Sequence, residues 1–239
     1  MRTDLNNSNR LMLTISMTAC YVDLQGSLGD QLFQVATGYA HCKRHSYELR
    51  LRSNPELSYW HTFLHKLIGS KGGKNLGLTW EEPGAAYTAV PFNAVNLFGR
   101  FQTSKYFAEY ATELRNLFVS PVIKHQSINP ESIVVYLDGT CSPAYYERAI
   151  HHMQFLQPKA DLLLVTKDGE PLHFENCTVI REPDESAALC LMRQCRYLVL
   201  SKSSLTWWGA WLAEKPLYVI APAGLAEDFY EARWDRMSQ

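Results

Sequence analysis

The stretch YLVLSKSSLTWWGAWLA, residues 197–213, joins an apolar run to a segment of helical spacing through a turn rich in serine. A short apolar run that leads into a helix is typical of a buried strand in a parallel sheet. The turn carries Ser201, Ser203 and Ser204, whose hydroxyls, together with the free N–H groups of the first helical turn, are suited to a pyrophosphate. The alternative is structural: Ser203 or Ser204 only caps the helix.

The same helix carries three tryptophans within five residues. Trp207 and Trp211 lie four positions apart and therefore share a helix face, which predicts that their indoles fill a core. Core packing accounts for most of the aromatic surface, but it does not account equally well for the cluster of serines. Both interpretations therefore stay open: a helix start packed into the core, and a turn that binds an anion.

Outward from this turn, the C-terminal half alternates apolar strand patterns with amphipathic helix patterns. We predict strands at 132–137, 161–166, 177–181, 196–200 and 216–221, and helices at 143–156, 184–195, 204–214 and 225–234. Near-continuous apolar strands that alternate with helices indicate a parallel sheet covered on both faces.

The N-terminal half shows the same alternation less clearly. We predict strands at 11–24, 47–51 and 94–99, a helix at 30–45, and a helix at 103–118 that Ser104 caps. Loops and short helices are expected between 52 and 92. The proline-containing, aperiodic segment around 121–130 is a candidate linker. The sequence thus predicts two Rossmann-type α/β domains, residues 1–120 and 131–239, that face a cleft.

Composition excludes several classes of function. The 239 residues carry a net charge of −1 and no basic block, which argues against a nucleic-acid partner. The apolar run 11–22 is too short to span a membrane, so we expect no transmembrane segment and a cytoplasmic protein. The six cysteines show no metal-ligand spacing, which favours reduced thiols and no metal site.

A second strand-to-helix turn, GSLGDQLFQ at 26–34, also follows a predicted strand. Gly26 and Gly29 let backbone N–H groups approach a ligand closely, and a helix N-terminus favours an anion. The alternative is a tight turn in which glycine serves only a positive φ. In a doubly wound sheet, ligands bind beyond the carboxyl ends of the strands, where both turns are expected to lie.

Three segments carry a resemblance to a known family. The segment GSLGDQLFQVATGYAHC (26–42) resembles the N-terminal signature of the α-1,2-fucosyltransferases, glycosyltransferase family 11. GRFQTSKYF (99–107) is similar to that family's Gly-aromatic-Phe-Gln segment, and CRYLVLSKSSLTWWGAWLAEKP (195–216) resembles its C-terminal signature. LLLVTKD (162–168) occupies the place of a family strand that ends in acids.

The resemblance implies a GT-B-like fold and a metal-independent, inverting transferase without a cofactor. It would move a 6-deoxyhexose, L-fucose from GDP-fucose in the family, to a hydroxyl of a glycan acceptor. Gly26, Gly29, Ser201, Ser203 and Ser204 would bind the donor. On the acceptor side, the resemblance implies cleft positions for Gln31, Arg100 and Gln102.

The sequence departs from the family where the C-terminal domain begins. The family's H-x-R-x-G-D stretch, whose arginine neutralises the donor diphosphate, corresponds here to IVVYLDGTCSPAYY (133–146). Val135 and Leu137 then replace the histidine and the arginine, and Thr140 replaces the aspartate. The loss of such a cation removes stabilisation from the leaving group. Alternatives are therefore a rhamnosyltransferase that uses a rhamnose nucleotide, or a catalytically silent protein that binds a glycan or nucleotide.

Two further departures suggest catalytic residues. Lys202 stands where the family has asparagine, and we hypothesise that it supplies the missing charge to the diphosphate; the alternative is a solvated lysine at a helix start. Asp30 also replaces an asparagine. Its carboxylate could accept the proton of the acceptor hydroxyl, as an inverting displacement requires, or it could only cap the helix 30–45.

Overall fold

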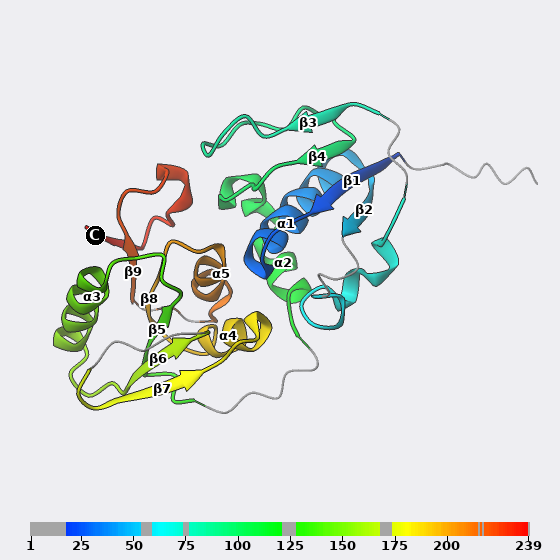
Figure 1. The fold of residues 1–239 in the computed structure, drawn as a ribbon. Helices are drawn as coiled ribbons and strands as arrows, with labels where there is room; N and C mark the ends of the chain where they lie inside the picture. The colour runs from blue at the N-terminus through cyan, green and yellow to red at the C-terminus, as the bar shows by residue number, and fades with distance from the viewer. Residues whose placement is uncertain are drawn as a thin grey trace, which may run out of the picture.

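The computed structural model describes residues 18–53, 59–73, 77–120, 128–167, 174–214, 216 and 218–238. Within them lie two parallel sheets whose strands point toward each other across the molecule (Figure 1). The predicted strand portion 11–17 and most of the predicted linker, 121–127, lie outside the described residues. The α/β class with parallel sheets that the sequence predicts is confirmed.

The N-terminal sheet has the order β2-β1-β4-β3, with all pairs parallel. Its strands are β1 (Ala19–Leu24), β2 (Glu48–Ser53), β3 (Thr79–Glu81) and β4 (Asn96–Phe98). The helix α1 (Leu28–His45) follows β1 and packs on it closely: a Cβ on Gly38 would lie 2.4 Å from a methyl carbon of Val22. The helix ends where Ser46 takes a φ of 56°, and basic residues in its last turn complement the helix dipole.

The C-terminal sheet has the order β10-β9-β8-β5-β6-β7, again with all pairs parallel. Its strands are β5 (Ile133–Leu137), β6 (Leu162–Thr166), β7 (Cys177–Arg181), β8 (Tyr197–Val199), β9 (Tyr218–Pro222) and β10 (Asp235–Met237). The helices are α3 (Pro143–Leu156), α4 (Glu185–Met192) and α5 (Ser204–Leu212).

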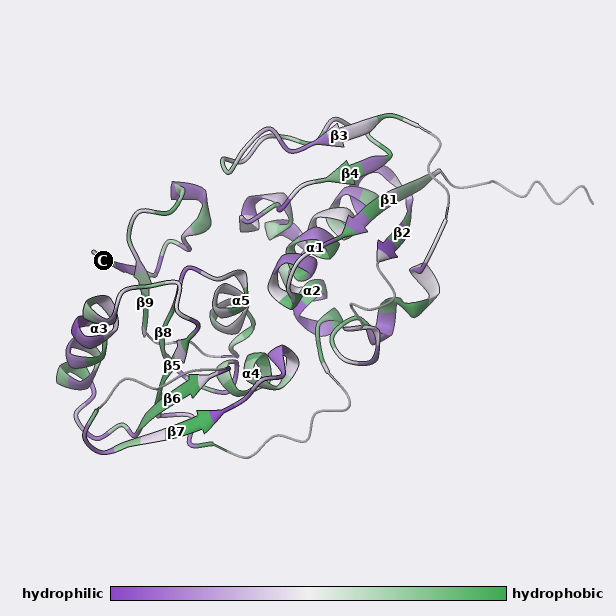
Figure 2. Cartoon of the chain, in the orientation of Figure 1, coloured by the Kyte–Doolittle hydropathy of each residue, from purple (hydrophilic) through white to green (hydrophobic). Residues whose placement is uncertain are grey.

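Side chains alternate between the two faces of this sheet, and both faces are covered. Ile133 and Val135 of β5 belong to a core with α3, whereas Val134 and Tyr136 belong to a core with α4 and α5. Figure 1 accordingly shows α3 on one side of the sheet and α4 and α5 on the side toward α1. Figure 2 shows β6 and β7 mostly hydrophobic and α3 mixed, as a helix with one solvent-facing side requires.

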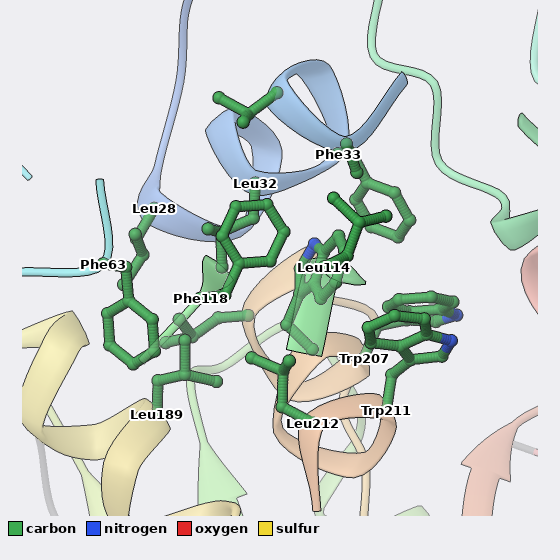
Figure 3. Close-up of a cluster of buried hydrophobic side chains, with 14 of the residues drawn as sticks. Leu28, Leu32, Phe33, Phe63, Leu114, Phe118, Leu189, Trp207, Trp211 and Leu212 are labelled. Carbon is green, nitrogen blue, oxygen red and sulfur yellow. The ribbon is translucent and has the colours of Figure 1, made fainter. Parts of the chain in front are cut away.

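The tryptophans of α5 form the joint between the two sheets. Trp207 and Trp208 are fully buried, and the centroids of their rings lie 4.5 and 5.0 Å from the centroid of the Phe33 ring in α1. Figure 3 shows Phe33 and Trp207 in the same cluster of buried side chains. Phe107 stacks on Trp208 at 5.6 Å. The prediction that the indoles fill a core is confirmed, and this core is continuous from one sheet to the other.

Two predicted helices are wrong in part or in whole. The segment 103–118 forms two 3₁₀ turns, Ser104–Tyr106 and Ala108–Tyr110, before the short helix α2 (Ala111–Leu117), and Thr103 rather than Ser104 is the cap. Phe107 breaks the helix with a φ of −141°, and this turns its ring into the tryptophan cluster. Tertiary packing thus overrides the helical period.

The predicted helix 225–234 is absent. The segment forms a 3₁₀ turn, Glu227–Phe229, and the chain then adds β10 to the edge of the sheet beside β9. Hydrogen bonds hold the non-helical path: Trp207 Nε1 donates to the carbonyl of Phe229 at 2.7 Å, and the Tyr230 hydroxyl bridges the backbone of Leu225 and Pro222 at 2.9 Å each.

Candidate functional site

The two serine- and glycine-containing turns meet where the carboxyl ends of the sheets face each other. A Cβ on Gly29 would lie 2.4 Å from the backbone nitrogen of Leu205 and 2.6 Å from the hydroxyl oxygen of Ser204. The hydroxyls of Ser27 and Ser204 are 3.4 Å apart. The N-termini of α1 and α5 are therefore in direct contact, and Gly29 permits that approach because it lacks a side chain.

The start of α1 is built around Asp30. Gly26, with a φ of 77°, makes the turn, and the Asp30 carboxylate accepts the hydroxyl of Ser27 at 3.2 Å. Gln102 donates its amide to the other carboxylate oxygen at 2.9 Å. Gln31 is fully buried and donates to the carbonyl of Gly26 at 3.1 Å. The Asp30 oxygen that accepts from the Ser27 hydroxyl also accepts the backbone N–H of Ser27 at 3.4 Å. The N-cap of α1 is therefore Ser27 rather than Asp30, and Asp30 completes the capping box from the third position of the helix. Its role as a base stays a prediction.

Glu185, the first residue of α4, contacts the N-terminal half of the chain, a role that the sequence did not predict. Its carboxylate accepts the backbone N–H of Leu28, in the first turn of α1, and the hydroxyl of Tyr59, both at 2.8 Å. Burial and then this carboxylate raise the pKa of Tyr59 above its usual range. Asp184 caps its own helix, as an acid at a helix start should. Glu185 instead accepts from the first turn of α1, a contact that spacing along the sequence cannot reveal.

The start of α5 is capped by hydroxyls. Ser203 accepts the backbone N–H of Thr206 at 3.3 Å, and Ser204 is 6% exposed. Ser201 is fully buried and donates its hydroxyl at 2.5 Å to Asp138, which follows β5. The capping alternative therefore holds for Ser203. Donor binding by these serines and by Gly26 and Gly29 stays a prediction.

Lys202 lies between these serines with its side chain exposed. Its backbone N–H donates at 3.1 Å to the hydroxyl of Thr140, which in turn donates to Asp138 at 2.6 Å. Thr140, which stands in place of the family's aspartate, therefore ties the turn before α5 to the end of β5.

A cavity of about 240 Å³ lies between the two halves of the chain at this point. Residues from the starts of α1, α4 and α5 and from the ends of β5 and β6 form its wall: Ser27, Tyr136, Leu137, Asp138, Lys167, Glu185, Ser203 and Leu205. We call this the donor-side cavity, after the prediction that the serines at the start of α5 bind the donor. Lys167 and Glu185 also line a neighbouring cavity of about 420 Å³ beside Tyr59 and the start of α4. Lys202 is not among the residues that line either one.

Two further cavities, of about 250 and 330 Å³, open on the N-terminal side and share Phe98, Gly99 and Arg100. Asp30 lines the first and Gln102 lines the second. Arg100 is exposed, and its backbone N–H donates to Glu82 at 2.8 Å. The structure thus places Asp30, Arg100 and Gln102 around these two cavities, whereas Gln31 is fully buried.

Among the residues that the structure describes, no group of three or more histidine, cysteine, aspartate or glutamate side chains is arranged to hold a metal ion. Nor does any helix in these ranges have the length and apolarity needed to cross a membrane.

The chain is similar to proteins that are described as glycosyltransferases. No protein-family model matches the chain. An α-1,2-colitosyltransferase of Escherichia coli is 22% identical over 86% of this chain and 92% of its own length. The iron-containing dodecameric glycosyltransferase TibC of enterotoxigenic E. coli H10407 superposes with a TM-score of 0.55 at 12% identity.

TibC is longer than this protein: the match covers 92% of the chain and 62% of TibC. A second TibC structure, described as a heptosyltransferase in complex with ADP-D-β-D-heptose, matches with a TM-score of 0.54 at 11% identity. These structures confirm the GT-B-like fold expected for this chain, and in sequence the chain resembles an α-1,2-colitosyltransferase.

Proposed function

We propose that this protein transfers a 6-deoxyhexose, with L-fucose or the related colitose as the first candidates, from a nucleotide-sugar to a hydroxyl of a glycan, with inversion. The observation that carries the proposal is that two unlike cavities are lined by neighbouring residues at the start of α1, Ser27 in one and Gly26 and Asp30 in the other. The donor-side cavity offers a helix start and an ammonium group, and the cavity on the N-terminal side offers the Asp30 carboxylate. The colitosyltransferase relative supports the choice of sugar class.

In this proposal, the diphosphate of the donor lies at the start of α5, where Ser203 lines the cavity and Ser204 lies beside it. As the glycosidic bond to the diphosphate breaks, negative charge grows on the leaving oxygen. Helix N–H groups and a nearby cation stabilise that charge without reorganising. No cofactor or metal takes part in the reaction as proposed.

Asp30 is the base of the proposed reaction. Its carboxylate lines the N-terminal cavity, and the hydrogen bonds from Ser27 and Gln102 fix its orientation. In the proposed reaction it accepts the proton of the attacking hydroxyl while the sugar moves to that oxygen. Arg100 and the 39% exposed Phe98 form the surrounding surface, on which the acceptor glycan would lie.

A silent binding protein is the second candidate, and one observation favours it. Val135 is fully buried in the core of the C-terminal domain, and Leu137 presents an apolar side chain to the donor-side cavity. The two positions that carry a histidine and an arginine in the resembling family therefore supply no charge here. A protein that retains the cavity without turnover would show the same arrangement.

A donor screen separates these candidates. Purified protein is incubated with GDP-fucose, a nucleotide-activated colitose, and UDP- and dTDP-rhamnose, each with a panel of glycan acceptors, and nucleotide release is measured. Thermal shifts with the same donors and with free nucleotides report binding. Turnover with inverted anomeric configuration by NMR supports the transferase and identifies the donor. A thermal shift without turnover supports the silent protein. If the protein shows neither turnover nor a thermal shift, both candidate functions are contradicted.

A further inference from the structure

We propose that Lys167 is the cation that contacts the diphosphate of the nucleotide-sugar in the donor-side cavity. The inference rests on the proposed function and adds a residue to it. From the sequence, Lys202 was expected to perform this task. Both lysines are exposed, but only Lys167 lines the donor-side cavity.

The strand register places Lys167 at the mouth of the cavity. Leu137 at the end of β5 pairs with Thr166 at the end of β6, so the next residues, Asp138 and Lys167, leave the same edge of the sheet side by side. Both line the donor-side cavity. Lys167 also lines the neighbouring cavity beside Tyr59, so its ammonium group can reach the region where the two cavities adjoin.

The wall of the donor-side cavity already carries negative charge, so a bound diphosphate would require a compensating cation. Asp138 and Glu185 both contribute carboxylates to the donor-side cavity, and a diphosphate would add further negative charge. Lys167 is the sole lysine or arginine among the described residues that line it. The compact ammonium of lysine is a common partner for phosphate oxygens.

Existing contacts leave Lys167 available for that role. Asp138 is occupied by the hydroxyls of Ser201 and Thr140, and Glu185 is occupied by Leu28 and Tyr59. Within the described ranges, Lys167 itself has no ion pair or hydrogen bond from its side chain. Lys167, without a partner among the described residues, and the start of α5 line the same cavity, so together they would offer an incoming diphosphate positive charge from two elements.

The test compares the same substitution at three lysines, Lys167→Met, Lys202→Met and Lys159→Met. Lys159 is exposed and precedes the amino end of β6, whereas Lys167 follows its carboxyl end, so it controls for removal of a surface charge. Binding of GDP, ADP, UDP and dTDP, and of the matching nucleosides, is measured by calorimetry at two salt concentrations. Circular dichroism checks the fold of each variant.

We expect Lys167→Met to weaken binding of the preferred nucleoside diphosphate by about 10- to 100-fold, as the loss of a charged hydrogen bond implies. Binding of the nucleoside should be unchanged, the salt dependence should fall, and Lys167→Arg should restore part of the affinity. An unchanged diphosphate affinity in Lys167→Met, or a loss confined to Lys202→Met, would overturn the inference and leave the proposed function intact. If the unmodified protein binds no nucleoside diphosphate, the proposed function itself fails.

Discussion

The starts of α1 and α5 look alike in sequence but differ in what already occupies them. At α1, carboxylates of the chain itself serve the first turn: Asp30 accepts Ser27, and Glu185 accepts the N–H of Leu28. At α5, the neutral hydroxyl of Ser203 is the cap, and the cavity with Lys167 lies alongside. A helix N-terminus attracts an anion only where no anion is in place. The comparison therefore favours α5 as the anion site and α1 as the place of the base.

The largest expected effect comes from removing the proposed base at α1. Asp30→Asn keeps the size of the side chain and an oxygen that can accept from Ser27, but it cannot take up a proton. We expect kcat to fall by about 10²- to 10⁴-fold with little change in donor affinity. Single-turnover kinetics with the donor found by the screen provide the measurement. Asp161→Asn, at the amino end of β6, is the matched control. Turnover near that of the unmodified protein would leave Asp30 with its capping role alone.

The contact between the two helix starts is tested by Gly29→Ala. The added Cβ would overlap the backbone nitrogen of Leu205, which cannot move without shifting α5. We expect a loss of about 2–3 kcal/mol in the free energy of unfolding, measured by urea denaturation. Gly69→Ala is the control, since a Cβ there meets nothing within 4 Å. Equal stability of the two variants would show that the helices can separate at no cost.

Glu185→Gln should change stability and anion affinity in opposite directions. The neutral amide weakens the hydrogen bonds to Leu28 and Tyr59, so we expect a loss of about 1–2 kcal/mol in unfolding free energy. It also removes a negative charge from the donor-side cavity, which should tighten binding of a nucleoside diphosphate. Denaturation and calorimetry measure the two effects, with Glu147→Gln on the exposed side of α3 as control. Weaker diphosphate binding would contradict the placement of the anion in this cavity.

The smallest effect concerns the caps. Ser203→Ala should cost about 1 kcal/mol of stability through the lost bond to Thr206, and it should also weaken diphosphate binding. Ser142→Ala removes the corresponding cap of α3, where Ser142 accepts the N–H of Tyr145 at 3.2 Å, and Ser142 is not among the residues of the donor-side cavity. Thermal melts and calorimetry on both variants distinguish the roles. Identical diphosphate affinity in the two would mean that Ser203 acts on the fold alone.

Local pattern was sufficient for most of the C-terminal half. The helix predicted at 143–156 coincides with α3, and β5, β6 and β7 lie within a residue of their predicted bounds. β5 and β6 are buried along almost their whole length and α3 buries one face, which gives each of them a clear local pattern. Prediction failed where a distant partner decides the backbone. Phe107 breaks its helix to reach Trp208, and Phe229 leaves the helical path to accept the indole N–H of Trp207.

The residues of the candidate site fall into the same two groups, those that a local pattern reveals and those whose role depends on a distant part of the chain. Its serines and glycines follow apolar strands and could be recognised in one dimension, as could Asp30 at the start of a helix. Glu185 and Lys167 could not, because their contribution depends on which helix start or strand end the fold places across from them. The position of Lys167 follows only once β5 and β6 are known to be neighbours in register.

The shared aromatic core between the sheets also bears on how the protein handles its ligands. One apolar core contains Trp207 and Trp208 from one half and Phe33 and Phe107 from the other. Separating the two halves would therefore expose several indole and phenyl rings to water at once. Substrates should therefore enter through movement of the loops that rim the cavities rather than through a hinge. For the same reason, the two halves should melt as one cooperative unit, and either half expressed alone should aggregate through its bared aromatic face.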